Sequence, residues 1–273
     1  MRRLLLALAA LAALPAAAAA ETEVDVELVL AVDISRSMDF EELKLQRDGY
    51  VQAFRDPAVI RAVEGGLIGR IAVLYFEWAG PSIRNVVGEW RLIEDAEDAA
   101  AFADDLAAGA VTAAIGTSIS GALDYAVSAF DGNGFAGLRR VIDVSGDGPN
   151  NAGTPVTRAR DAAVAAGVTV NGLPVMLKAH DGPFSLRELD VYYEDCVIGG
   201  PLSFVLPLWE ADKFAETVRR KLILEISGLT PPAPPRVIPA QLGLGPKRTE
   251  PRIDCLIGEK RRERWMRQRG WDW

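Results

Sequence analysis

Five oxygen-bearing side chains stand where apolar runs end or helices begin. Asp33, Ser35 and Ser37 alternate in the segment DISRS, directly after the apolar run ELVLAV. Thr117 opens the segment GTSISGAL, and Asp147 follows the run RVIDVS in the segment VSGDG. Because ligands of an open α/β sheet bind beyond the carboxyl ends of its strands, these side chains are expected to meet at one edge of a sheet.

The chemistry of this set favours a hard cation. Oxygen ligands without histidine or cysteine select Mg²⁺, Ca²⁺ or Mn²⁺ over zinc or copper. Mg²⁺ takes six oxygen ligands, so hydroxyl groups with only two carboxylates leave a position for an outside anion. In the alternative interpretation, the hydroxyl residues only cap helices and the aspartates only end strands. Caps explain each residue separately, but they do not explain why all five converge.

Short apolar runs typical of strands alternate along the chain with longer segments of helical pattern, and these elements must position the five residues. This alternation predicts an α/β fold, doubly wound, with a mostly parallel sheet and helices on both faces. Residues 82–87 are expected to form an antiparallel edge strand, because the connection 78–81 is too short for a crossover helix. The other strands are expected at residues 27–33, 69–76, 140–145, 168–175 and 203–208. The helices are expected at residues 40–54, 96–107, 118–130, 157–166 and 211–226.

The first 20 residues have the pattern of a secretory signal peptide. Two arginines precede an apolar stretch, Pro15 and a run of alanines, which predicts cleavage near Ala20. A retained membrane anchor is the alternative, although the apolar stretch is shorter than the roughly 20 residues that cross a bilayer. No later segment is apolar and long enough to span a membrane. The mature chain is therefore expected to be periplasmic or secreted.

The net charge bears on the class of binding partner, and the two cysteines bear on a disulfide. The formal net charge is −8, which argues against general nucleic-acid binding. In an oxidising compartment, Cys196 and Cys255 are expected to form a disulfide. Two free, buried thiols are the alternative.

Composition changes at Thr230, where the segment TPPAPPRVIP is typical of a polyproline-like linker. The main domain is therefore expected to cover residues 21–229. Residues 230–273 are expected to be a Pro-rich linker and a C-terminal extension, which ends in the basic, Trp-containing segment KRRERWMRQRGWDW. This extension either contacts an acidic partner or membrane surface, or forms a short helix that folds back and is held by Cys255.

The combination of motifs resembles the von Willebrand factor A (vWA) family over roughly residues 25–227. Asp-x-Ser-x-Ser after the first strand, Gly-Thr at a helix start and Asp-Gly after a later strand are similar to the family's metal-ion-dependent adhesion site. The resemblance implies a six-stranded sheet with one antiparallel edge. It also implies that Ser35 and Ser37 bind the metal directly, Thr117 directly or through water, and Asp33 and Asp147 mostly through water. The segments YYEDCVIGG and KLILE look like those of a secreted bacterial subgroup of unassigned function.

These observations predict a binding domain and not an enzyme. A divalent cation, Mg²⁺ in the first instance, is expected to bind an Asp or Glu carboxylate of a protein partner. No Gly-x-Ser-x-Gly elbow and no phosphate-binding Gly-x-x-x-x-Gly-Lys loop is present. Two alternatives stay open: a structural or assembly factor of an envelope complex, and a metal-assisted hydrolase.

Overall fold

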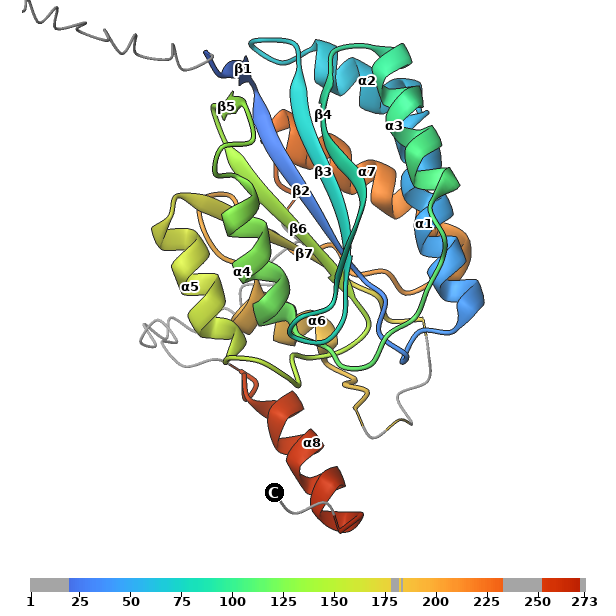
Figure 1. Cartoon of the computed structure of the whole chain (residues 1–273), viewed down its shortest axis with the longest axis vertical. Coiled ribbons are helices and arrows are strands. Elements are labelled where there is room, and N and C mark those ends of the chain that lie inside the picture. The colour runs from blue at the N-terminus through green and yellow to red at the C-terminus, as the bar shows by residue number, and fades with distance from the viewer. Residues whose placement is uncertain (1–19, 178–181, 183, 233–251, 271–273) are drawn as a thin grey trace, which may run out of the picture.

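The computed structural model describes residues 20–177, 182, 184–232 and 252–270, and a central sheet forms its core (Figure 1). Four neighbouring strands are parallel, and one edge strand is antiparallel. The expected α/β class with a mostly parallel sheet is therefore confirmed. In spatial order the strands are β4 (Arg84–Ile93), β3 (Ile71–Trp78), β2 (Val26–Asp33), β6 (Arg140–Gly146) and β7 (Val168–Pro174).

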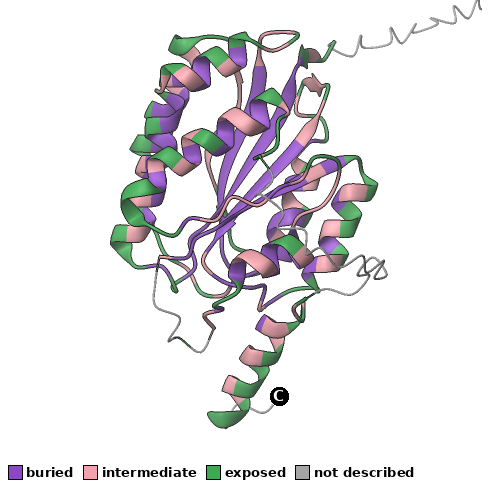
Figure 2. Ribbon diagram, turned by 180° about the vertical axis from the view of Figure 1, so that it is seen from behind, coloured by how far each residue is buried: buried purple, intermediate pink, exposed green. Residues whose placement is uncertain are grey.

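Helices cover both faces of this sheet, as the sequence predicts. Along the middle strand β2, Leu28 and Leu30 pack into the core on one face, and Val29 packs into the core on the other. The inner strands β2 and β3 are accordingly buried along their length, whereas the helices expose their outer sides (Figure 2). One face carries α1 (Phe40–Phe54), α2 (Pro57–Glu64), α3 (Ala96–Ala108) and α7 (Phe214–Ser227), and the other carries α4 (Ile119–Ala129) and α5 (Val156–Ala165).

The number of strands differs from the expected six, because the sheet has five strands among the described residues. Residues 203–208 do lie beside β7, but they form only isolated bridges, such as the one between Val205 and Gly172. Leu206 and Leu208 donate to the carbonyls of Gly172 and Pro174, but Pro174 has no N–H with which to continue the ladder toward Leu206. The sixth segment therefore follows the edge of the sheet without forming a regular strand.

Helix α1 begins at a capping box that fixes the chain just beyond the end of β2. The Asp39 side chain accepts a hydrogen bond from the Glu42 backbone N–H at 3.0 Å, and the Glu42 side chain accepts one from the Asp39 N–H at 2.9 Å. Reciprocal bonds of this kind satisfy two N–H groups that the helix leaves unpaired. The short DISRS segment is thus held between a buried strand and a fixed helix start.

Several short elements were not expected from the sequence. They are β1 (Thr22–Val24) paired with β5 (Phe135–Gly137), helix α2, helix α6 (Leu189–Tyr192) and the π-helical turn η1 (Tyr193–Val197). The 3-10 turn η2 (Ala211–Lys213) lies at the start of the predicted helix 211–226, and helix α8 (Ile257–Gln268) is the short helix that one of the two alternatives predicted for the C-terminal extension. The predicted signal peptide, apart from residue 20, and residues 233–251 of the predicted linker lie outside the described residues. Within the described part of the chain, no helix combines the length and the apolar character needed to cross a membrane.

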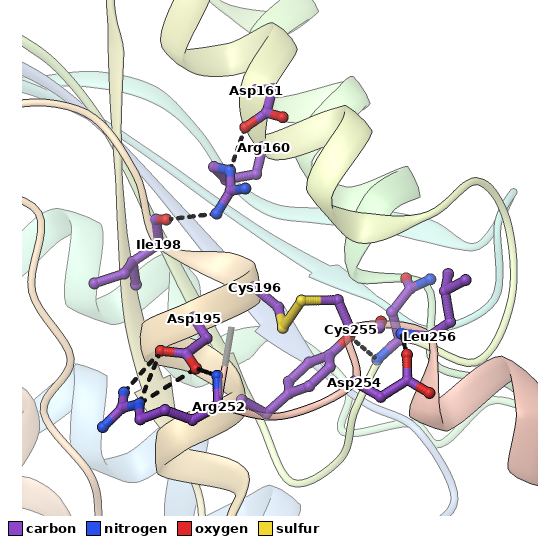
Figure 3. The surroundings of a disulfide bond; sticks show 11 residues. Arg160, Asp161, Asp195, Cys196, Ile198, Arg252, Asp254, Cys255 and Leu256 are labelled. Carbon is purple, nitrogen blue, oxygen red and sulfur yellow. Dashed lines mark hydrogen bonds and ion pairs between the residues drawn. A yellow bond between two sulfur atoms is a disulfide. The ribbon is translucent and has the colours of Figure 1, made fainter. Parts of the chain in front are cut away.

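A disulfide joins the two cysteines and holds the start of the C-terminal helix against the domain (Figure 3). Cys196 lies in η1, and Cys255 lies two residues before α8. Arg252 strengthens this junction through ion pairs with Glu194 and with Asp195, the latter at 2.8 Å. The disulfide predicted from the expected oxidising compartment is therefore present, and α8 projects beyond the sheet from this anchored start (Figure 1).

A buried cluster of charged groups fastens α7 to the sheet. Lys221 of α7 forms ion pairs with Glu225 one turn later and with Asp143 in the middle of β6, the second at 2.7 Å. All three side chains are at most 1% exposed. Asn171 of β7 donates a further hydrogen bond to Glu225 at 3.0 Å. Two carboxylates thus share one ammonium group away from water.

This cluster makes stability depend on pH. Burial, with the charge of Asp143 adding to it and Lys221 opposing it, raises the pKa of Glu225 from 4.5 to about 7. The folded state therefore binds a proton more tightly than the unfolded state. The resulting stabilisation is complete below about pH 4.5 and is lost as the pH rises through about 7. Urea unfolding between about pH 5 and pH 8 is expected to show a smaller decline in the Glu225→Gln variant than in the wild type. Parallel pH profiles of the two proteins would contradict this assignment.

Candidate metal centre

The carboxyl ends of β2 and β6 place the predicted ligands at one edge of the sheet. Asp33 is the last residue of β2, and Asp147 follows β6 directly. The two strands are parallel neighbours, with Val32 opposite Ser145. Residues separated by more than one hundred positions therefore leave the sheet side by side, as expected for an open α/β sheet.

Hydrogen bonds connect four of the five predicted residues. The Asp33 Oδ1 atom accepts a bond from the Ser35 backbone N–H at 2.7 Å, which folds the chain back into a turn. The Ser35 and Ser37 hydroxyl oxygens lie 2.9 Å apart. The Ser37 hydroxyl donates to Asp147 Oδ1 at 2.6 Å across 110 residues of sequence. The alternation in the DISRS segment thus directs its oxygen atoms to one place, where they meet Asp147.

The cluster is buried at one end and open at the other. Asp33 and Ser35 are 0% and 2% exposed, whereas Ser37 is exposed and Asp147 is partly exposed. A ligand could therefore approach from the side of Ser37 and Asp147.

Asp33 is a buried carboxylate close to a second negative charge. Its Oδ2 atom is buried and has no hydrogen-bond partner. Burial, together with the negative charge of Asp147, raises the pKa of Asp33 well above its ordinary value. The backbone of Gly146 makes room for this carboxylate, since a Cβ atom there would lie 2.9 Å from Asp33 Oδ2. An unpartnered buried carboxylate oxygen beside a second carboxylate is suited to a cation, which would offset both charges.

Thr117 is held at the same edge through its backbone. Asn151 receives a bond from the Thr117 N–H on its Oδ1 atom at 3.0 Å, and its own N–H donates to the Thr117 carbonyl at 2.8 Å. On the other side, the Ala114 N–H donates to the Ile34 carbonyl at 2.8 Å. The loop of Thr117 is therefore attached both to the turn after β2 and to the loop after β6.

Sequence reasoning missed several residues that support this edge. Gln46 of α1 donates to the carbonyl of Asp33 at 2.9 Å, and it accepts a bond from the Ser145 hydroxyl at 3.4 Å. Its position between Leu43 and Tyr50 on the buried side of α1 was the available signal. A polar side chain on an otherwise apolar helix face has to find partners inside the protein.

Three further residues support this edge. Asn150 accepts a hydrogen bond from the Ser120 N–H at 3.0 Å, and Asn151 holds Thr117. Glu77 is 3% exposed and forms an ion pair with Arg47. These side chains join the loops around the site to one another and to α1.

The donor set fits a hard divalent cation. It consists of two carboxylates and three hydroxyl groups, which are the ligands that Mg²⁺, Ca²⁺ and Mn²⁺ prefer. Within the residues that the structure describes, no group of three or more His, Cys, Asp or Glu side chains is arranged to bind a metal. The candidate donors at this edge are oxygen atoms, and three of them belong to the neutral hydroxyls of Ser35, Ser37 and Thr117.

The order of strands, the antiparallel edge and the helices on both faces define a vWA-like fold, which solved structures of that class share. By sequence, the chain belongs to the family described as "Protein of unknown function (DUF1194)", whose profile matches residues 23–230. A comparison with curated proteins finds no match.

Three solved structures illustrate the similarity in fold. Proximal thread matrix protein 1 from the mussel byssus has a TM-score of 0.55 and 16% identity, covering 76% of this chain and 49% of that one. The von Willebrand factor type A protein from Catenulispora acidiphila has a TM-score of 0.52 and 18% identity, covering 75% and 43%. The pilus adhesin SpaC from Lactobacillus rhamnosus GG has a TM-score of 0.52 and 14% identity, covering 76% and 31%.

The mussel protein has also been solved with zinc in its metal-ion-dependent adhesion site (MIDAS) motif. That structure has a TM-score of 0.50 and 16% identity, covering 76% of this chain and 49% of that one. This chain spans less than half the length of each of these proteins. At such identities the likeness establishes the fold, and the function has to be argued from the site.

Proposed function

We propose that this protein is an exported domain that binds a divalent cation and, through it, an Asp or Glu carboxylate of a protein partner. The observation that carries the proposal is the convergence of two distant segments: Ser37 bonds to Asp147, 2.6 Å away, beside the buried and partly unpartnered carboxylate of Asp33. Caps and turns account for single residues, but they give no reason to bring two carboxylates together at an edge open to solvent.

The proposed ligands are the five residues that the motifs single out. Mg²⁺ is the first choice, with Ca²⁺ or Mn²⁺ as alternatives, because the donors are carboxylate and hydroxyl oxygens. When bound, the cation would supply positive charge for a carboxylate that approaches from outside. The protein's own residues hold the loops in place: Gln46 fixes the end of β2, and Asn151 fixes Thr117. The zinc-occupied MIDAS motif of the mussel protein supports a divalent metal at such an edge.

A binding role is favoured over catalysis. The groups that contact Asp33, Ser35 and Thr117 in the described residues are hydroxyls, amides and a second carboxylate, which suit the binding of a cation. Asp33 and Asp147 are the groups at this edge that could transfer protons, and the proposal assigns both of them to the cation.

We also propose the organisation and the location of the chain. Residues 1–20 are a cleaved signal peptide, residues 21–229 form the vWA-like domain, and residues 230–273 form a linker and extension. The disulfide between Cys196 and Cys255 supports an oxidising compartment, such as the periplasm or the exterior.

The first test is a calorimetric titration of Mg²⁺ into the mature chain. We expect saturable binding by the wild type, and at least a tenfold loss of affinity in Asp33→Ala and in Asp147→Ala, because each variant removes one of the two negative charges that the cation offsets. Asp104→Ala is the matched control, since it removes an exposed carboxylate on α3. Equal Mg²⁺ affinity in all four proteins would reject the proposed metal centre.

Affinity capture from the native compartment, with and without EDTA, separates the binding role from a purely structural one. A partner that binds through the cation is expected to be lost with EDTA and with Asp147→Ala. A partner retained under both conditions would instead favour the role of an assembly factor.

A further inference from the structure

The C-terminal helix α8 begins in direct contact with the loop that follows Asp147. Gly258, in its first turn, is buried against the backbone of this loop. A Cβ atom at this position would overlap the carbonyl oxygen of Asn150, and it would also come close to Pro149. Only glycine allows such an approach, because it has no side chain. The helix and the loop are therefore in closer contact than any larger residue would permit.

Two side chains of α8 extend this contact with polar bonds. The Asn150 side-chain amide donates to Glu259 Oε1 at 2.7 Å, and Arg262 donates to the carbonyl of Asn151 at 3.3 Å. Tyr192 links the loop to the C-terminal segment. Its hydroxyl accepts a bond from the Asn150 N–H at 3.2 Å and donates to the carbonyl of Cys255 at 3.5 Å. Both asparagines are thus held from the side of the C-terminal segment.

The same two asparagines hold the candidate metal centre from their other side. Asn151 fixes Thr117 by accepting its N–H on the side-chain Oδ1 atom and by donating its own backbone N–H to the Thr117 carbonyl, and Asn150 accepts the N–H of Ser120 at the start of α4. A continuous set of contacts therefore runs from α8 through Asn150 and Asn151 to Thr117, and the same short loop carries Asp147.

The disulfide keeps this contact in place. It anchors Cys255 to η1 only two residues before α8, so the helix cannot separate far from the loop (Figure 3). A covalent tether gives the two Asn contacts a high effective concentration, although each is a modest interaction by itself.

We propose that the start of α8 is a positioning element for the candidate metal centre. Gly258, Glu259 and Arg262 fix the loop of residues 147–151, and through Asn151 they fix Thr117, so the affinity for the cation depends on docking of the C-terminal segment. This inference rests on the proposed function, because it assigns a role toward the same site. It differs from that function in naming residues outside the ligand set.

The test compares two double variants of the mature chain, in which the disulfide is intact. Glu259→Ala/Arg262→Ala removes the two contacts with the loop, and Glu263→Ala/Arg267→Ala removes an exposed ion pair farther along the same helix. We expect the first variant to bind Mg²⁺ about tenfold more weakly, as is usual when groups that orient metal ligands are removed, and the second to match the wild type. Glu259→Gln retains an acceptor oxygen for Asn150 and is expected to retain wild-type affinity.

Hydrogen exchange without metal gives a second readout, which a general loss of stability would not reproduce. In the first variant, and in Gly258→Val, amide exchange is expected to speed up in residues 147–152 and at Thr117, but not in β2. If the wild type fails to bind Mg²⁺, the proposed function fails, and the exchange result decides alone whether α8 positions the loop. Unchanged exchange in both variants, or an unchanged affinity beside a wild type that binds, would overturn the inference.

Discussion

Replacing Lys221 with methionine is expected to lower the free energy of unfolding by about 3–5 kcal/mol at neutral pH. The substitution keeps most of the side-chain volume, but it removes the ammonium group that Asp143 and Glu225 share. Both carboxylates are completely buried, so water cannot replace the lost partner. Urea denaturation followed by circular dichroism measures this loss directly.

Two comparisons make this expectation specific to the buried cluster. Lys213→Met removes a lysine that pairs with Glu216 on the surface, and it is expected to leave the free energy of unfolding close to that of the wild type. Adding Asp143→Asn and Glu225→Gln to Lys221→Met is expected to recover much of the loss, since no buried charge is then left unpaired. A Lys221→Met variant as stable as Lys213→Met would show that the cluster does not hold α7 to the sheet.

Removing the disulfide is the second large change. Cys196→Ala/Cys255→Ala is expected to reduce the free energy of unfolding by about 4 kcal/mol in the chain-entropy description, because the bridge closes a loop with a sequence separation of 59. The unfolded chain gains freedom when this loop opens. Denaturant unfolding of the variant and of the wild type, each with and without a reducing agent, measures the effect.

The reducing agent serves as the internal control. The chain has only these two cysteines, so reductant is expected to bring the wild type to the stability of the variant and to leave the variant unchanged. If all four measurements agree, the bridge contributes nothing to the stability of the domain.

Much of the fold follows from patterns that act locally. Helix α1 has the expected limits of 40 and 54, because apolar side chains recur at helical spacing and Asp39 with Glu42 caps its start. Strand β2 was predicted from an apolar run, and its eight residues are buried because helices cover both faces of the sheet. The ends of β2 and β6 then place Asp33 and Asp147 together, so four of the five candidate ligands could be grouped from sequence alone.

The remaining features depend on contacts that no local pattern records. Residues 203–208 have the composition of a strand, but Pro174 of β7 lacks the N–H that a regular ladder would need beside them. Asn150 is buried against Gly258, which is more than one hundred residues away in the sequence. Gly258 belongs to a segment whose placement the sequence left open. Sequence spacing singled out the candidate ligands, whereas the residues that hold their loops could be identified only from tertiary contacts.

The position of β2 has a consequence for how tightly ions could be held. It is the innermost strand, and it is bonded along its length to β3 and β6, so its amides should open only when the whole domain unfolds. Asp33 therefore sits on the stiffest part of the molecule, whereas Thr117 is carried by a loop with far fewer bonds to its neighbours. If related chains differ in their affinity for the proposed cation, the differences should accordingly lie in the loop residues and not in β2.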